Sequence, residues 1–426
     1  MKIEIKQILG QLRRGEVPEG YKMVGRHLAP AEWKVMHMSD IYTERKEPGE
    51  ETLPILTVSI HSGVSDGALD EEEIGKPVKR MEDKSQYKKA VSGDLVFNMM
   101  RAWQGAVGTV RTTGMVSPAY IVATPNNAVD PIFMDYYMKT PLMIHTMHSQ
   151  SYGVTDFRLR LYWDSFTPIK GAFPSIEEQQ RIAVILTAQD KVIELKEKLL
   201  AKKEKRHANF RFQLLSGRIR LSGYSVPWHR TQLGRIIKKE NKKNKDFKYQ
   251  YVFSNSAQHG IILQQEQFKK DIANTDRIDG YYISEPGMFA YNPRISKSAP
   301  CGPIRRNDLG KTGVMSPLYT LFSITDKDIN SDFLDSYFRS NLWNSYMKSV
   351  ANYGARHDRM AVSMEDFFGM PIPVPDLEEQ KAIAEVLSTA DRELDLLRQD
   401  IEAEQQKKKA LMQLLLTGIV RVNHET

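Results

Sequence analysis

Cysteine is nearly absent from this 426-residue sequence, which contains Cys301 alone. A single thiol cannot close an internal disulfide, and without CxxC pairs or Cys/His clusters the sequence has no recognisable zinc motif. The ten histidines form neither HExxH nor any repeated ligand spacing. These absences exclude the common metal signatures and favour a reducing compartment, so we expect the protein in the cytoplasm.

Long apolar runs are also missing. The first eleven residues alternate charged with apolar side chains, unlike a signal peptide, and no run approaches the ~20 apolar residues that cross a bilayer. We therefore expect no contact with a membrane. The 60 Lys and Arg against 53 Asp and Glu give a net charge of +7. This mild basic excess favours a polyanionic partner such as nucleic acid without requiring one.

Each catalytic motif that the sequence matches in part is incomplete. The segment 309–312 (LGKT) ends like a phosphate-binding loop, but Arg305 occupies the position of the required first glycine. Residues 291–294 (YNPR) lack the second proline and the aromatic residue of an adenine-methyltransferase motif. Asp376 and Glu379 imitate a nuclease site at a spacing that fits a helix start instead. We predict a chain without catalytic activity; an enzyme with an unrecognised site is the alternative.

The chain contains an internal repeat. Residues 174–183 (PSIEEQQRIA) match 375–384 (PDLEEQKAIA) at an offset of 201, and 214–217 (LLSG) match 415–418 (LLTG) at the same offset. Upstream, the SPxY segments at 117–120 and 316–319 match at 199. Small drifts in offset are typical of loop insertions in two copies of one fold. At roughly 150 residues per domain, the length also fits more than one domain.

Each copy divides into a globular part and a helical part. The globular parts carry short strands and many turn residues, with buried strands predicted at 94–100 and 319–324. The fold class is therefore α+β, with a pseudo-twofold internal repeat. We predict a first globular domain at 1–173, a helical region at 174–220, a second globular domain at 221–374 and a second helical region at 375–426.

Start and stop signals delimit the helical regions. Capping boxes begin them at Ser175 and Asp376, and the glycines Gly217 and Gly418 end them. Second cap signals at Thr187 and Ser388 predict a restart or kink in each. Apolar residues recur at heptad spacing. They are Ile193, Leu200, Phe210 and Leu214 in the first region, and Leu394, Leu397, Ile401, Leu411 and Leu415 in the second.

The middle of each apolar stripe is polar, so either helix alone would form a poor coiled-coil seam. An antiparallel pairing of the two regions would bring Lys203 near Glu404 and relate the copies by a pseudo-twofold axis. The alternative is two helical hairpins that never meet. A helix from Asp190 to Gly217 would be roughly 42 Å long, close to 12 base pairs of DNA.

This duplicated arrangement resembles the specificity subunit of type I DNA restriction-modification systems over essentially the whole chain. The resemblance implies that the globules are target recognition domains, each reading half of a bipartite double-stranded DNA site. It implies that the helical regions form an antiparallel coiled coil that docks two modification (methyltransferase) subunits, which restriction (translocase and nuclease) subunits then join. S-adenosylmethionine, ATP and Mg would be bound by those partners, and no cofactor by this chain. A coiled-coil DNA scaffold without sequence preference is a further alternative.

The candidate DNA-binding residues are polar or basic side chains in turns at equivalent places of the two copies, because arginine and asparagine can contact base edges. A solvated loop or a structural hydrogen bond is the alternative role for each. In the first copy they are Asn98, Arg101, Gln104, Arg111, Tyr152, Thr155, Asp156 and Arg158; in the second, Asn292, Arg294, Lys297, Arg305, Arg306, Tyr353, Arg356, His357 and Arg359.

The candidate partner-binding residues lie at the two helix starts, where both copies repeat the same polar side chains. They are Glu177, Gln179, Glu378 and Gln380, which we predict on the outer face of the helical regions. Helix capping and solvation are their alternative roles.

Overall fold

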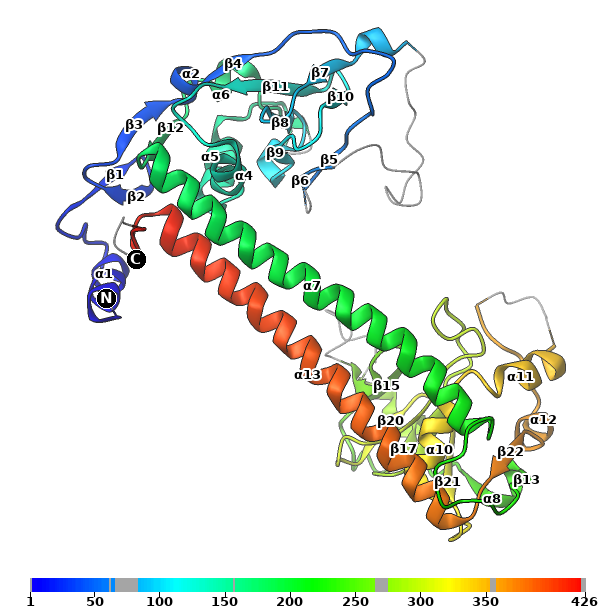
Figure 1. Ribbon diagram of the computed structural model, residues 1–426. Helices are drawn as coiled ribbons and strands as arrows, with labels where there is room; N and C mark the ends of the chain where they lie inside the picture. Colours follow the sequence, from blue (N-terminus) through cyan, green and yellow to red (C-terminus); the bar gives the residue numbers. More distant parts are fainter. Residues whose placement is uncertain are drawn as a thin grey trace. The chain divides into compact units, whose positions relative to one another are not determined.

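The computed structural model describes residues 2–60, 63–65, 83–155, 158–264, 275–352 and 358–422. Contacts divide the chain into a first unit, Met1–Lys196 with Asp400–Thr426, and a second unit, Glu197–Gln399 (Figure 1). Each unit therefore contains one globular part together with one half of each long helix, α7 (Ile176–Leu215) and α13 (Leu377–Leu416).

Short antiparallel strands and helices build the first globular part. Its elements are α1 (Lys2–Arg13), β1 (Tyr21–Val24), β2 (His27–Pro30), β3 (Lys34–His37), α2 (Met38–Ile41), β4 (Tyr42–Glu44), β5 (Val58–Ser59), β6 (Gly63–Val64), η1 (Lys84–Gln86), β7 (Lys88–Ala90), β8 (Leu95–Asn98), η2 (Ala102–Gln104), β9 (Val107–Thr109), β10 (Gly114–Val116), β11 (Tyr120–Pro125), α4 (Pro131–Met138), α5 (Pro141–Gln150), α6 (Trp163–Phe166) and β12 (Lys170–Phe173).

The second globular part repeats this order from β3 onward. Its elements are β13 (His229–Gln232), α8 (Leu233–Ile236), β14 (Ile237–Glu240), β15 (Phe253–Ser256), β16 (Gly260–Leu263), η4 (Thr275–Gly280), β17 (Tyr282–Ser284), β18 (Phe289–Tyr291), β19 (Ile304–Arg306), β20 (Gly313–Met315), β21 (Thr320–Ile324), α10 (Ser331–Phe338), α11 (Asn344–Val350), α12 (Met364–Phe368) and β22 (Pro371–Val374).

Sheet topology confirms that the two globular parts share one α+β fold. Each has a four-stranded antiparallel sheet, in the order β4-β11-β8-β9 in the first unit and β14-β21-β18-β19 in the second. The hairpins also correspond: β5–β6 matches β15–β16, and β12–β3 matches β22–β13. The buried strands predicted at 94–100 and 319–324 are β8 and β21.

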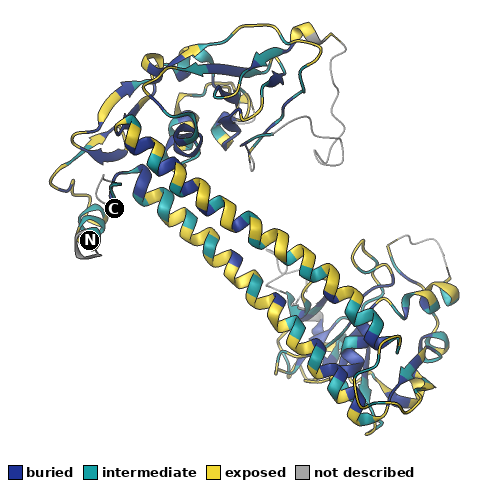
Figure 2. Cartoon of the chain, in the orientation of Figure 1, coloured by how far each residue is buried: buried dark blue, intermediate teal, exposed yellow. Residues whose placement is uncertain are grey.

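Aromatic side chains fill the two cores. Phe97, on β8, packs on Phe166 with ring centroids 4.9 Å apart, and in the second unit Phe289 stacks on Phe322 at 5.4 Å. All four are fully buried. Figure 2 shows the burial gathered in the sheet interiors and the exposed residues along the outer sides of α7 and α13.

The two long helices begin and end where the sequence predicts. Ser175 Oγ accepts a hydrogen bond from Glu178 N at 3.3 Å, and Asp376 Oδ1 accepts one from Glu379 N at 2.9 Å, so both N-caps are confirmed. Gly217 and Gly418 follow the last turns with φ of 71° and 66°. Side chains rarely adopt this left-handed conformation, which explains glycine at both positions.

The predicted restart or kink after Thr187 and Ser388 is wrong, because α7 and α13 are each uninterrupted over 40 residues. The buried face passes through both positions at heptad spacing, from Leu186 to Ile193 and from Leu387 to Leu394. Continuous burial of this face outweighs the weak cap signals. Of the predicted heptad residues, Ile193, Leu214, Leu394, Ile401 and Leu415 are buried, and Leu200, Phe210, Leu397 and Leu411 are half-buried.

Within each unit, one half of α7 packs antiparallel on one half of α13 (Figure 1). In the first unit, Asp190 pairs with Lys408 at 2.5 Å, and further along α7 Lys196 pairs with Glu404 at 2.9 Å. The partner numbers fall as the α7 numbers rise, which defines the direction.

The second unit shows the same direction, with Glu204 paired to Arg398 at 2.6 Å and Arg211 to Asp391 at 2.5 Å. The helices therefore do meet, which excludes separate hairpins. The predicted pairing of Lys203 with Glu404 is wrong, since Lys203 pairs with Glu393.

Candidate nucleic-acid interface

Two equivalent asparagines shape the turns that follow β8 and β18. Asn98 Oδ1 accepts a hydrogen bond from Met100 N at 2.9 Å, and Asn292 Oδ1 accepts one from Arg294 N at 3.0 Å. Asn292 also donates through Nδ2 to Asn255 O at 3.0 Å. Such side-chain-to-backbone bonds fix tight turns. The asparagines therefore fix the backbone of the turns that carry the neighbouring exposed side chains.

A groove of about 520 Å³ in the second unit collects three of the predicted DNA-binding residues: Asn292, Arg294 and Arg359. Ser316 and Tyr319 of the repeated SPxY segment line the same groove. The backbones of Arg294 and Arg359 pair in a β-bridge, and both guanidinium groups lie 3.8 Å from the carboxylate of Asp358. Each arginine has five N–H donors, so one shared and distant carboxylate leaves most of them available to a ligand.

Asn255 lines this groove and was missed by the sequence reasoning. Its side chain is 2% exposed, and its Nδ2 donates to Ala290 O at 2.7 Å and Pro303 O at 3.0 Å. Its Oδ1 has no hydrogen-bond partner among the described residues. The hairpin registers place Val58 at the same position of the first unit. Asn255 Oδ1 is therefore a buried acceptor at a position where the other copy is apolar, and unpaired buried acceptors are costly.

The predicted residues of the first unit lie on exposed turns. Arg101 precedes η2, Gln104 is its last residue, and Arg111 pairs with Asp135 at 3.4 Å. Tyr152 is 59% exposed and packs on Tyr162 with ring centroids 5.0 Å apart.

Tyr152 opens a tight loop. A side chain at Gly153 would place its Cβ 2.3 Å from Arg158 O, so the loop requires glycine there. Thr155 and Arg158 are exposed in the same loop, and Asp156 lies outside the described residues. The DNA contacts assigned to this set stay predictions.

The remaining predicted residues of the second unit have different surroundings. Arg306 pairs with Asp308 at 2.6 Å and Asp332 at 2.7 Å, which ties β19 to the first turn of α10 and gives it a structural role. Arg305 faces another cleft, described below, and Lys297 is exposed. Tyr353, Arg356 and His357 lie outside the described residues.

The prediction of an outer-face position is wrong for Gln179 and Gln380, because both are fully buried. Gln179 Oε1 accepts from Asp130 N at 2.9 Å, and Gln380 Oε1 accepts from Asn330 N at 2.8 Å. Each Nε2 donates to two backbone carbonyls. The two amides thus join each long helix to its globular part. Glu177 and Glu378 are exposed, so their partner-binding role stays a prediction.

The glutamates next to these glutamines, Glu178 and Glu379, also make equivalent contacts in the two copies. Arg421 binds Glu178 through Nε at 2.8 Å and Nη2 at 2.6 Å, and Arg220 binds Glu379 through the same two nitrogens, each at 2.6 Å. The Glu178 carboxylate raises the pKa of Arg421. In a full capping box, each glutamate would also accept a hydrogen bond from the backbone N–H of its N-cap residue. Glu178 and Glu379 bind arginine instead, so only half of each capping box forms.

The described residues contain neither a metal-binding cluster nor a membrane-spanning helix. None of their His, Cys, Asp and Glu side chains form a group of three or more that could hold a metal ion. No helix among them is both long and apolar enough to cross a membrane.

Known proteins resemble the chain over most of its length. The family model described as the type I restriction modification DNA specificity domain matches residues 294–405. The type I restriction enzyme MjaVIII specificity subunit of Methanocaldococcus jannaschii is 21% identical over 449 residues, which cover 95% of this chain and 97% of that protein.

Two solved structures show that the fold is shared. The HsdS subunit from Thermoanaerobacter tengcongensis superposes with a TM-score of 0.51 at 17% identity, covering 93% of this chain and 99% of its own. A chain from a study of complex assembly and conformational transition of the type I R-M system superposes with a TM-score of 0.57 at 16% identity, covering 92% and 99%.

Proposed function

Because this chain belongs to the specificity subunits of type I restriction-modification systems, we propose that it reads a bipartite double-stranded DNA target, one half with each globular part. The observation that carries the proposal is that the two copies share one backbone fold but have different side chains at equivalent positions. Asn255 replaces Val58, and Arg294 replaces Met100, at equivalent positions of the repeated fold. Exchanging side chains on a constant backbone lets two copies recognise different base sequences.

The proposed complex supplies the chemistry through other subunits. Two modification subunits with S-adenosylmethionine would methylate the target, and restriction subunits with ATP and Mg would cleave DNA in the cytoplasm. This chain would catalyse neither step. Incubating the isolated chain with DNA, Mg, ATP and S-adenosylmethionine tests that role, since methyl transfer or cleavage without a partner would favour the enzyme alternative. A scaffold without sequence preference would bind random DNA as well as any selected site.

Exchanging one globular part is expected to change one half of the target. Residues 17–173 would be replaced by the equivalent segment of a relative with a known target, because the first globular part has its own four-stranded sheet. The long-helix residues that complete its core, such as Leu186 and Leu415, stay in place. Methylome sequencing of cells that carry the hybrid with its modification subunit identifies the new target. A change confined to one half supports separate reading, whereas changes in both halves contradict it.

Charge reversal at the exposed helix starts is expected to weaken assembly with the modification subunit. The variant carries Glu177→Lys and Glu378→Lys, which leave the buried residues Gln179 and Gln380 in place. Co-purification with the modification subunit should fall at least several-fold, while thermal unfolding of the isolated chain stays unchanged. Glu402→Lys, an exposed residue far along α13, is the control. Unchanged assembly would place the interface elsewhere.

A further inference from the structure

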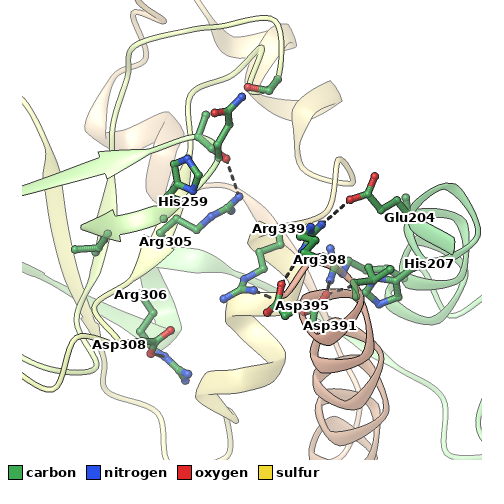
Figure 3. A pocket seen from close by; sticks show the side chains of 18 of the residues that line it. Glu204, His207, His259, Arg305, Arg306, Asp308, Arg339, Asp391, Asp395 and Arg398 are labelled. Carbon is green, nitrogen blue, oxygen red and sulfur yellow. Dashed lines mark hydrogen bonds and ion pairs between the residues drawn. The ribbon is translucent and has the colours of Figure 1, made fainter. Parts of the chain in front are cut away.

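A second cavity in the second unit is lined mainly by charged side chains (Figure 3). This basic cleft has a volume of about 960 Å³ and lies between the α7–α13 pair, the β15–β16 hairpin and β19. It shares Ala257, Gln258 and Ser298 with the groove that contains Arg294. A ligand in the cleft would therefore adjoin the proposed base-reading groove.

The charges of the basic cleft do not balance. Its lining contains five arginines and four carboxylates. Each carboxylate is paired: Glu204 and Asp395 with Arg398, Asp308 with Arg306, and Asp391 with Arg211. Arg339 also pairs with Asp335 at 2.7 Å. Of the five arginines, Arg305 has no ion pair with a carboxylate of the described residues.

The contacts of Arg305 are with backbone oxygens. It donates to the carbonyl oxygens of Ile304 at 3.1 Å and Ala257 at 3.4 Å, and no described carboxylate forms an ion pair with it. Burial lowers the pKa of Arg305, as expected for a cation that water solvates poorly and no anion contacts. Figure 3 shows Arg305 and His259 on the strand side of the cleft, facing the α7–α13 side chains. A bound anion would compensate this charge.

Two further buried nitrogens in the basic cleft have no hydrogen-bond partner among the described residues. His207 is 8% exposed, and its Nε2 lacks a hydrogen-bond partner among the described residues; the buried Nε of Arg211 also lacks one. Both side chains contact Asp391, through His207 Nδ1 at 3.4 Å and Arg211 Nη2 at 2.5 Å. A buried N–H group without an acceptor, such as Arg211 Nε, is uncommon in proteins and marks a site where a ligand or water supplies one.

The first unit lacks two of these cations at the equivalent positions. The 201 offset places Met412 at the position of Arg211, and the strand registers place Gly108 at that of Arg305. Lys408 and Lys139 keep a cation at the positions of His207 and Arg339. Arg305 and Arg211 are therefore specific to the second copy, which favours a binding role over a structural one.

We propose that the basic cleft binds a backbone phosphate of DNA next to the half-site read by the second unit, with Arg305 as its main contact. This inference rests on the proposed DNA-binding function. A phosphodiester carries one negative charge and so matches the single arginine without an ion pair, whereas a nucleoside triphosphate would bring several. Arginine donates bidentate hydrogen bonds to phosphate oxygens, and contacts of this kind position a protein on DNA without reading sequence.

Arg305→Gln tests the proposal in the full chain bound to duplexes that contain its methylated target. Affinity should fall about 10-fold at low salt, equally for target and random DNA, and the slope of log affinity against log salt should decrease by about 1. Lys327→Gln removes the same charge from an exposed position of the same unit and serves as the control. An affinity and slope equal to those of Lys327→Gln would overturn the proposal. Wild-type protein that binds no DNA would instead refute the proposed function.

Two further measurements separate folding and ligand source. In the first, each phosphate along the target is replaced in turn by a neutral methylphosphonate. Replacing one phosphate beside the second half-site should weaken DNA binding by the wild-type protein, a result that does not depend on how Arg305→Gln folds. Uniform effects at all phosphates there would contradict the proposal. Inorganic phosphate is the second probe: if it raises the melting temperature of the wild type but not of Arg305→Gln, and DNA affinity is equal in both, the cleft binds free phosphate and the DNA assignment is overturned.

Discussion

Replacing Gln380 with leucine is expected to lower the free energy of unfolding of the second unit by about 3 kcal/mol. The side chain is fully buried and makes three hydrogen bonds, to Asn330 N at 2.8 Å, Asp328 O at 3.0 Å and Pro375 O at 2.9 Å. Leucine fills a similar volume but leaves these backbone groups without their partner. Each buried polar group left unpaired costs about 1–3 kcal/mol.

Urea unfolding followed by tryptophan fluorescence and hydrogen exchange measures this loss. Trp228 and Trp343 report on the second unit, and Trp33, Trp103 and Trp163 on the first. Gln179→Leu should produce the equivalent loss in the first unit, because its side chain makes the matching three bonds. Gln180→Leu, one residue along and exposed, is the control and should change little. If Gln380→Leu were as stable as this control, the buried amide would not join helix and globular part.

Sequence repetition revealed the architecture but not why each residue is repeated. The offset of 201, the two N-caps and the two terminal glycines all follow from local patterns, and the structure confirms them. Gln179 and Gln380 were repeated too, and we interpreted them as a shared partner surface. They are repeated because each closes the same buried hydrogen-bond network. Repetition marks a shared constraint, and burial decides which kind it is.

The candidate DNA site was predicted at the level of loops. Arg294 and Arg359 were both expected, and strand pairing brings them together although 65 positions separate them. Arg306 shows the limit, because its partner Asp332 lies on another element and the ion pair is invisible in the sequence. Asn255 was not predicted for a related reason: only the hairpin register reveals that it replaces Val58. Whether a side chain has a structural or a ligand-directed role depends on its tertiary partners, and local sequence patterns do not encode those partners.

Removing one heptad from each long helix is expected to shorten the spacer of the DNA target by about 3 base pairs. The hypothesis is that α7 and α13 set the distance between the two half-sites. Deleting Leu199–Lys205 from α7 and Asp400–Gln406 from α13 removes seven residues of each helix, or about 10 Å of helical rise. One base pair occupies about 3.4 Å of duplex. Both half-site sequences should remain as before, since neither globular part is altered.

The antiparallel pairing explains why the deletions must be matched. In the intact chain, 196 on α7 lies opposite 400 on α13, and 203 lies opposite 393. After both deletions, 191–198 would face 391–398, so Ile193 would lie opposite 396, next to the half-buried Leu397, and the heptad seam would continue. Deleting Leu199–Lys205 alone leaves α13 seven residues too long. That single deletion should lower affinity at every spacer and serves as the contrast.

Binding to a library with constant half-sites and spacers varied by single base pairs decides the question. The matched deletion should bind best at a spacer about 3 base pairs shorter, with co-purification of the modification subunit as the check on assembly. If the globular parts were positioned by their partners or by contact with each other, the original spacer would remain best, or no spacer would restore binding. A folded, partner-competent double deletion that still prefers the original spacer would show that helix length does not set the half-site separation.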